Sequence, residues 1–330
     1  MKNLKNAVAS ILDSNTFKKE LAAVNALQIC YHKLCNNLCF DDSLTGNKET
    51  IVSGGVALSS KHAKDCLEDS IRTARFLKGI YKALMVAKAR FKKEKITILY
   101  AGCGPLGTLI IPLLHLFSDD DIEIILLDIH QTSINSVIKI VKELGYESYI
   151  NKYLVADATK YKHPKNKFLH VVISETMDRA LVKEPQVEII KNLSKQLVSN
   201  GIFVPEKIKV NRGYSSFSKE YVFNSFLNED KLKNNFKTKI EELFSITKDI
   251  DSDAPFEYET DPIPISFDFK NTPDLCLYTE VTIFKDLKLK KAESYITNPI
   301  CIKSLYAIKS NNYKLKYQTH GVPNWEILEV

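Results

Sequence analysis

Two glutamates, Glu175 and Glu184, are the residues in this sequence best placed to do chemistry. They stand nine residues apart in the segment SETMDRALVKE. Glu175 is the last residue of the run at 168–175, and Glu184 directly precedes Pro185, which predicts the start of a helix. Two carboxylates on one hairpin-like loop can face a single planar cation, and a guanidinium presents its N–H donors in a matching fork. The alternative interpretation leaves Glu184 as a charge at a helix N-terminus and Glu175 in solvent.

A second group of residues could bind a ribose-containing cofactor. The segment YAGCGPLG places Gly102 and Gly104 between an apolar strand and the next apolar segment, where a ligand can approach the backbone. Asp128 ends the following apolar run, where its carboxylate can accept hydrogen bonds from both ribose hydroxyls. The glycines, with Gly107, fit the G-x-G-x-x-G fingerprint of NAD enzymes and also the looser glycine loop of S-adenosylmethionine enzymes. A purely structural turn is the third alternative.

A third motif precedes the glycine loop. Asp69, Arg72 and Thr73 lie in the segment DSIRTARF, within a helix predicted over 60–93 and capped by Ser59 or Ser60. Asp69 and Arg72 are three residues apart and therefore share one helical face. Taken alone, they would form a surface ion pair of little energetic value.

The elements that must position these motifs alternate between short apolar runs and helical segments. This alternation predicts βαβ units and an α/β fold with a doubly wound, mostly parallel sheet covered on both faces. Strands are predicted at 96–102, 122–129, 148–158, 168–175 and 202–210, and helices at 108–117, 132–145 and 187–201.

The chain divides into three parts by sequence character. Residues 1–56 form an N-terminal helical segment whose last part, 45–55, reads as a loop. Residues 57–205 form the α/β domain. Residues 206–330 alternate as antiparallel strands do, which predicts a β-barrel-like domain with a helical insertion near 217–246.

Composition limits the partners. The chain has 330 residues, 45% of them apolar, and a net charge of +6, so a large core can form. Lysines greatly outnumber arginines, and no basic stripe of the kind that nucleic-acid readers use is present. We expect a cytoplasmic protein, because the count of 7 cysteines is odd and no signal sequence is apparent. We expect no membrane span, because glycines and prolines interrupt the uncharged run 96–117. Cys35 and Cys39 share one helical face, but Cys30 lies well off it, so the three are interpreted as packing residues and we expect no metal site.

In combination, the three motifs resemble the protein arginine methyltransferases, class I S-adenosylmethionine-dependent enzymes with a double-E loop. The resemblance covers about 57–210 and rests on the order Asp-x-x-Arg-Thr, glycine loop, and Ser-Glu-x-Met followed by a second Glu. The segment NGIFVP, which ends at Pro205, matches the strand entry that follows the double-E loop in that family. The fold implied is a Rossmann-like methyltransferase domain joined to an antiparallel β-barrel with a helical dimerisation arm, here at 217–246, and hence a homodimer.

The resemblance also implies a cofactor, S-adenosyl-L-methionine, and a role for each motif residue. Glu175 and Glu184 would be catalytic and clamp the acceptor guanidinium, with Asp69 on the substrate side. The cofactor would be bound at its carboxylate by Arg72, along its methionyl-ribose part by Gly102 and Gly104, at the ribose by Asp128, at adenine by Asp157 and near the sulfonium by Met177.

Several departures from the family pattern leave the acceptor open. Tyr100 stands where an acidic residue is usual, and Leu106 displaces the third loop glycine. The upstream Tyr-Phe motif is absent, and the turn 294–299 stands in place of the Thr-His-Trp loop that closes the arginine site. The leading hypothesis is methyl transfer to a peptide or protein arginine. The alternatives are a small amine or guanidine, a peptide natural product, an NAD-dependent oxidoreductase, and a non-catalytic scaffold.

Overall fold

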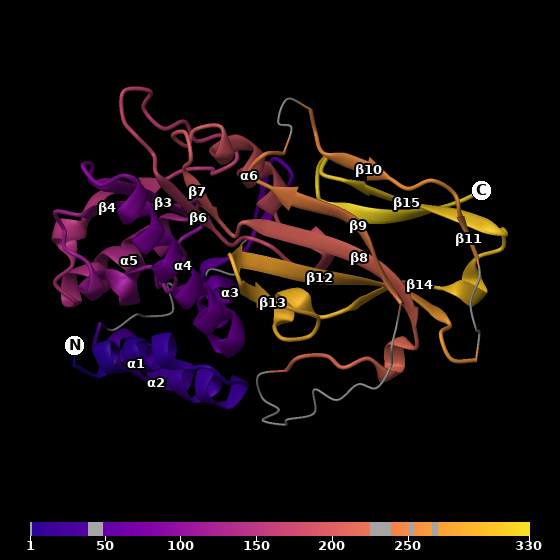
Figure 1. Cartoon of the computed structure of the whole chain (residues 1–330), viewed down its shortest axis with the longest axis horizontal. Coiled ribbons are helices and arrows are strands. Elements are labelled where there is room, and N and C mark those ends of the chain that lie inside the picture. The colour runs from indigo at the N-terminus through magenta and orange to yellow at the C-terminus, as the bar shows by residue number, and fades with distance from the viewer. Residues whose placement is uncertain (1, 39–48, 225–238, 251–253, 266–269) are drawn as a thin grey trace.

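The structure is a computed structural model that describes residues 2–38, 49–224, 239–250, 254–265 and 270–330 (Figure 1). Helices and strands alternate in the first part of this chain, and strands dominate after Pro205. Cys39 and the middle of the predicted helical insertion lie outside the described residues.

Five strands form the predicted parallel sheet, in the order β5-β4-β3-β6-β7, and every neighbouring pair is parallel. The chain enters at the middle strand, moves out to β5 and then returns to the other side through β6 and β7. This reversal confirms a doubly wound α/β sheet, whose ligand sites lie at the carboxyl ends of the strands near the switch. The strands are β3 (Ile96–Ala101), β4 (Ile122–Asp128), β5 (Ile150–Val155), β6 (Val171–Ser174) and β7 (Ile202–Val204).

Helices cover this sheet through their apolar faces. Helix α5 (Gln131–Glu143) buries Ile134, Val137 and Val141 and contacts β4 and β5. Helix α6 (Gln186–Ser194) contacts β6, and α4 (Ser70–Arg90) contacts β6 and β7. The sheet core is therefore apolar on both sides.

The predicted helix over 108–117 is wrong. Only a short 3₁₀ helix, η3 (Ile111–Leu116), forms there. Gly107 adopts a left-handed φ of 58°, and Pro112 provides no N–H for a helical hydrogen bond near the start. The buried apolar side chains of this segment still pack under the glycine loop.

The N-terminal part contains two helices, α1 (Lys2–Asp13) and α2 (Phe17–Asn37). The segment predicted as a loop instead contains a β-hairpin, β1 (Thr50–Val52) and β2 (Gly55–Ala57), in antiparallel register. Its two-residue turn ends at Gly54, which has a φ of 70°, a conformation that glycine adopts without strain.

The continuous helix predicted over 60–93 is broken at Asp69. Helix α3 (Ser60–Asp65) and the 3₁₀ helix η2 (Cys66–Glu68) come first, and the cap predicted at Ser59 accepts a hydrogen bond from the His62 N–H. Asp69 then serves as N-cap of α4, with its Oδ1 accepting from the Arg72 N–H at 3.2 Å. Asp69 therefore precedes the helix that carries Arg72.

Two antiparallel sheets form the C-terminal part. The first has the order β13-β12-β8-β9, with β14 paired to β12, and the second has the order β10-β15-β11, with β16 paired to β15. The predicted strand over 202–210 is divided, because the chain leaves the parallel sheet after Val204 and begins β8 at Lys207. The bounds are β8 (Lys207–Ser215), β9 (Ile240–Thr247), β10 (Glu257–Glu259), β11 (Ile263–Pro264), β12 (Asp274–Phe284), β13 (Leu287–Leu289), β14 (Ile300–Ser304), β15 (Asn312–Gln318) and β16 (Asn324–Glu329).

The helix predicted near 217–246 is wrong at its C-terminal end. Residues 240–247 form β9, which pairs antiparallel with β8. At the other end only a single 3₁₀ turn, η6 (Phe217–Lys219), is present. Residues 225–238 lie outside the described part of the chain, so the dimerisation arm, the homodimer and the domain boundaries stay predictions.

Aromatic side chains join the two antiparallel sheets. The Phe244 ring of β9 lies 5.3 Å from the Tyr317 ring and 5.7 Å from the Trp325 ring, centroid to centroid. The first sheet in turn contacts α4 through β12 and β13, so the two halves of the molecule share an interface along α4 (Figure 1).

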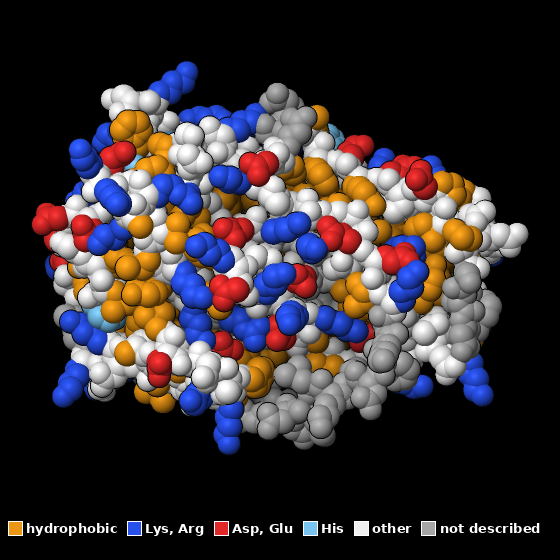
Figure 2. All heavy atoms as spheres, viewed as in Figure 1, with side chains coloured by type: hydrophobic (Ala, Val, Ile, Leu, Met, Phe, Trp, Pro, Cys, Tyr) orange, Lys and Arg blue, Asp and Glu red, His pale blue; other side chains and the backbone are white. Residues whose placement is uncertain are grey.

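The outer surface is mixed in charge on the face drawn in Figure 2, where Lys and Arg side chains lie among Asp and Glu. Ion pairs between described residues include Lys209–Glu242 at 2.7 Å and Lys288–Glu280 at 3.1 Å. None of the helices in the described ranges combines the length and apolar character that crossing a membrane requires.

Candidate active site

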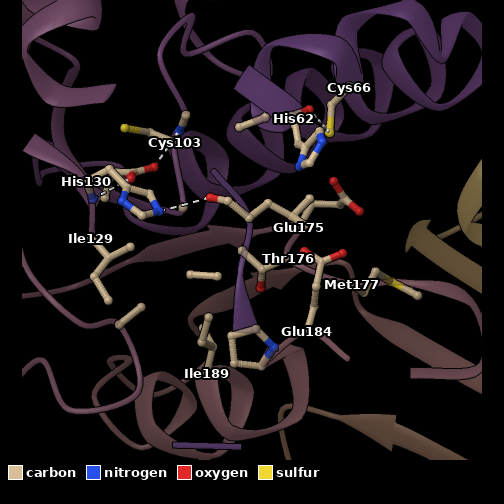
Figure 3. Close-up of a pocket in the computed structure, with 18 of the residues that line it drawn as sticks. His62, Cys66, Cys103, Ile129, His130, Glu175, Thr176, Met177, Glu184 and Ile189 are labelled. Atoms are coloured by element: carbon tan, nitrogen blue, oxygen red, sulfur yellow. Dashed lines mark hydrogen bonds between the residues drawn. The ribbon is translucent and has the colours of Figure 1, made fainter. Parts of the chain in front are cut away.

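A cavity of about 420 Å³ lies at the carboxyl ends of β3, β4 and β6 (Figure 3). It occupies the position at which ligands bind in doubly wound sheets. The structure brings to its wall each residue predicted from the sequence to have a catalytic or binding role: Asp69, Arg72, Gly102, Gly104, Asp128, Asp157, Glu175, Met177 and Glu184.

The glycine loop brings bare backbone to this cavity. Gly102 and Gly104 have left-handed φ angles of 70° and 63°. A Cβ on Gly102 would lie 2.5 Å from the Thr176 Cγ2 atom, which is closer than real side chains approach. The N–H groups of Gly102 and Cys103 both donate to the Leu127 carbonyl, at 2.9 and 3.0 Å, and hold the loop against β4. Glycine is therefore required at position 102 for both the backbone turn and the space.

Asp128 is a buried carboxylate at the end of β4. Its Oδ2 accepts from the Gly104 N–H and its Oδ1 from the His130 N–H, both at 2.9 Å. Burial raises the pKa of Asp128, and these two hydrogen bonds oppose the rise. Because each carboxylate oxygen has a second lone pair, the group can still accept from a vicinal diol.

Two further side chains shape the cavity wall near Asp128. His130 Nε2 lies 3.0 Å from the Leu58 carbonyl oxygen, so this ring nitrogen carries the hydrogen and ties α5 to the segment before α3 (Figure 3). Asp157 Oδ1 accepts from both the N–H and the hydroxyl of Thr159, at 2.9 and 2.6 Å. These contacts fix Asp157 in a tight turn at the end of β5.

The two glutamates line the same cavity. Glu175 follows β6 directly, and Glu184 ends the loop that returns to α6. Figure 3 shows both carboxyl groups directed into the same space, with Met177 beside them. The arrangement predicted from their spacing in the sequence is present.

One of these two carboxylates, that of Glu175, is already paired with a guanidinium from this chain. Arg72 forms an ion pair with Glu175, and both side chains are buried. Arg72 Nη1 also donates to the Cys66 carbonyl at 3.0 Å. Its buried Nε has no hydrogen-bond partner among the described residues, although an unsatisfied buried donor is costly. Arg72 therefore presents one unused donor in the cavity.

Glu184 has an unusual protonation equilibrium. Burial raises its pKa to about 8, the negative charge of Asp178 adds to the rise, and Arg72 and Lys183 oppose it. At neutral pH Glu184 therefore holds a proton in this state. A cation placed against it would favour the ionised form.

Gln186 closes the glutamate loop, and nothing in the sequence indicated it. Its side chain is fully buried, with Oε1 accepting from the Thr176 N–H at 2.7 Å and Nε2 donating to the Ser174 carbonyl at 3.1 Å. These bonds tie the first residue of α6 to the end of β6. The ends of the loop are thereby held together beneath Glu175 and Glu184.

The C-terminal half supports the middle of the same loop. Ala180 donates its N–H to the Thr279 hydroxyl at 2.8 Å, and its carbonyl accepts from the Trp325 indole at 2.9 Å. The Tyr317 hydroxyl donates to the Leu181 carbonyl at 2.8 Å. Ala180 and Leu181 both have positive φ, 52° and 58°, which costs about 1–3 kcal/mol for such residues. These long-range bonds hold the strained turn in place.

A turn from the β domain completes the wall. The Ser294 hydroxyl and the Tyr295 N–H both donate to Asp69 Oδ2, at 2.7 and 2.8 Å. Tyr295 and Ile296 then line the cavity. Since the Asp69 oxygens are occupied by protein donors, this carboxylate connects α4 to the turn at 294–297.

Comparison with known proteins gives one kind of match. No family model matches the chain, and no curated protein does. Among solved structures, it resembles the PRMT1 enzyme–prozyme heterotetrameric complex of Trypanosoma brucei with AdoHcy, with 13% sequence identity and a TM-score of 0.49. The match covers 77% of this chain and 85% of that one.

Proposed function

We propose that this chain is an S-adenosylmethionine-dependent N-methyltransferase that methylates a guanidinium nitrogen, with an arginine of a peptide or protein as acceptor. One observation carries the proposal. Glu175 holds the guanidinium of Arg72 in the same cavity that contains Glu184, the glycine loop and Asp128. Cofactor residues and a guanidinium-binding carboxylate are thus in one place.

The residues present fit the cofactor. Asp128 has acceptor capacity for the ribose hydroxyls, and Gly102 leaves the backbone bare beside it. The unpartnered Nε of Arg72 suits the cofactor carboxylate, because a charged acceptor would satisfy this buried donor. Asp157 is assigned to adenine and Met177 to the neighbourhood of the sulfur. When bound, S-adenosylmethionine supplies a methyl group already activated on a positively charged sulfur.

The two glutamates hold and orient the acceptor. Glu175 and Glu184 each accept N–H groups of the guanidinium, which draws its positive charge toward the two nitrogens they contact. The third nitrogen then faces the methyl group with more electron density. Arg72, engaged by the cofactor carboxylate, leaves Glu175 available for this purpose. Orientation of this kind supplies a large part of the acceleration in a two-substrate transfer.

The test is a methyl-transfer assay with labelled S-adenosylmethionine. Arginine peptides are the acceptors, lysine peptides of the same sequence are the controls, and mass mapping identifies the modified atom. Glu175→Gln and Glu184→Gln should each lower kcat/KM by about 100-fold or more, while affinity for S-adenosylhomocysteine stays within about 3-fold. Glu143→Gln, on the exposed face of α5, is the matched control. Unchanged turnover in both glutamate variants would exclude the clamp.

A binding experiment separates this proposal from a nicotinamide enzyme. At 100 times its Kd, a ligand stabilises the folded state by about 2.7 kcal/mol. S-adenosylhomocysteine should produce this increase in thermal unfolding measurements and NAD should not. Stabilisation by NAD alone would overturn the cofactor assignment.

A further inference from the structure

A second hollow adjoins the acceptor end of the cavity. This groove, of about 650 Å³, is lined by Asp178, Arg179, Tyr295 and Asn298 and by the segment 222–224. Asp178 and Tyr295 also line the main cavity. The groove therefore borders the cavity that contains the two glutamates, and a long acceptor bound between them could extend into it.

One wall of the groove is preformed. Asn298 Oδ1 accepts from the Phe223 N–H at 2.6 Å, and its Nδ2 donates to the Phe223 carbonyl at 3.0 Å. The Phe223 ring lies edge to face with Tyr295, at a centroid distance of 5.1 Å. Both polar atoms of the Asn298 amide are thus bonded to the Phe223 backbone, and this wall offers apolar and aromatic surface to a ligand.

Asp178 is the acidic group at the junction. Its Oδ1 accepts from the Arg179 N–H at 2.6 Å and lies 3.5 Å from Arg179 Nε. Among the described residues, its Oδ2 has no hydrogen-bond or ion-pair partner. The side chain is 34% exposed, and its charge acts on Glu184, six residues later. A negative charge with one unused oxygen therefore lies where an acceptor would pass.

We propose that Asp178 determines acceptor specificity by binding a second positive charge of the acceptor in this groove, while the guanidinium lies between Glu175 and Glu184. The inference rests on the proposed function for the position of the guanidinium. It restricts the acceptor class to dications, in which an ammonium or a further guanidinium follows the methylated group at the distance of a short carbon chain. Arg179 competes with that second cation for Asp178.

Because Arg179 competes for Asp178, substitutions of these two residues should change the affinity for a dication in opposite directions. Asp178→Asn removes the charge but keeps an oxygen that can accept from the Arg179 N–H, so the turn can still form. Arg179→Gln removes the competing cation. The first variant should weaken binding of a dication and the second should strengthen it. A purely structural role for the pair would move both variants in the same direction.

The probes are 4-aminobutylguanidine and butylguanidine, which differ by one terminal ammonium. Calorimetric titration in saturating S-adenosylhomocysteine should show that the wild type binds 4-aminobutylguanidine about 5-fold more tightly than butylguanidine, as expected for a partly exposed ion pair. Asp178→Asn should abolish this preference and leave butylguanidine binding unchanged. Arg179→Gln should enlarge the preference. Asp261→Asn, an exposed residue that lines neither hollow, is the charge-matched control.

The outcomes separate the two proposals. Equal affinity for both probes in the wild type, or equal weakening of both by Asp178→Asn, overturns the role of Asp178 and leaves the methyltransferase proposal intact. A preference for the dication in the wild type, together with no methyl transfer to arginine peptides, supports the role of Asp178 and counts against the proposed reaction. Absence of binding by either probe overturns the role of Asp178, and the assay with arginine peptides then decides on the proposed reaction by itself.

Discussion

The hydroxyl of Ser294, in the β domain, lies 2.7 Å from the Asp69 carboxylate at the start of α4, 225 residues away in the chain. The neighbouring Tyr295 N–H donates to the same oxygen. Both groups are buried, so removing one donor would leave part of the carboxylate unsatisfied. These two hydrogen bonds fix the turn that places Tyr295 in the wall of the cavity.

Replacing Ser294 with Ala should therefore affect both stability and acceptor binding. Loss of one donor to a buried carboxylate should cost about 1–3 kcal/mol of unfolding free energy, and KM for the acceptor should rise more than the Kd for S-adenosylhomocysteine. Urea unfolding and steady-state kinetics measure the two effects. Ser10→Ala, on the exposed side of α1, is the control. An equal change in both affinities would mean that the turn does not act on the acceptor alone.

Arg72 and Glu175 should be energetically coupled. Arg72→Met leaves a buried carboxylate unpaired, which should cost about 3–5 kcal/mol. Adding Glu175→Gln to that variant should restore at least about 1 kcal/mol, because the second change removes the unpaired charge. The measurement is a double-mutant cycle in urea. Additive effects would contradict the buried ion pair.

Glu184 should make stability depend on pH in a specific direction. Its pKa is raised from 4.5 to about 8 in the folded state, so the folded protein binds the proton more tightly than the unfolded chain does. The stability contributed in this way is complete below the unfolded pKa and is lost as the pH rises through about 8. The wild type should therefore lose stability between about pH 5 and pH 9, whereas the Glu184→Gln variant should not. The Tm of the variant minus the Tm of the wild type should increase by about several degrees over this range. A flat difference across this range would exclude the raised pKa.

The same titration should appear in acceptor binding. A guanidinium pairs with ionised Glu184, so the affinity for the acceptor should increase as the pH rises through about 8. Measured in saturating S-adenosylhomocysteine, the increase should disappear in Glu184→Gln. An affinity that falls over this range in the wild type would place the acceptor away from Glu184.

Gly102 and Gly145 form a matched pair for the glycine loop. Both have left-handed φ angles, 70° and 66°, but a Cβ at Gly102 would meet Thr176, whereas a Cβ at Gly145 would meet nothing within 4 Å. Both alanine variants should lose about 1–2 kcal/mol of stability through backbone strain. Only Gly102→Ala should also lose affinity for S-adenosylhomocysteine, by about 10-fold or more. Equal affinities would show that the loop does not contact the cofactor.

The sequence predicted the parts of the site that depend on short-range pattern. Apolar runs crossing a sheet covered on both faces mark β3, β4 and β6, and residues that directly follow such runs, such as Asp128 and Glu175, must meet at one edge. The nine-residue spacing to Glu184 then defines the loop. Each of these inferences needs only local periodicity.

The features that were missed depend on distant partners or on competing local signals. The sequence around Ser294 does not indicate that its hydroxyl donates to the Asp69 carboxylate. The sequence around Gln186 likewise does not indicate that its amide bonds to the backbone of Thr176 and Ser174. The segment that forms β9 lies in the predicted helical insertion, whereas its burial alternates with period 2 from Phe244 onward, as a strand requires. The break at Asp69 was missed because the capping aspartate is followed by a strong helical pattern.

The hydrogen bonds from Thr279, Tyr317 and Trp325 to the backbone of Ala180 and Leu181 have a consequence for how this molecule can change over evolutionary time. The residues proposed to bind the cofactor all lie in one half of the chain, whereas the glutamate loop is held by hydrogen bonds from both halves. We therefore expect that exchanging the C-terminal half by recombination would keep the proposed cofactor residues and change the support of the glutamate loop in one step.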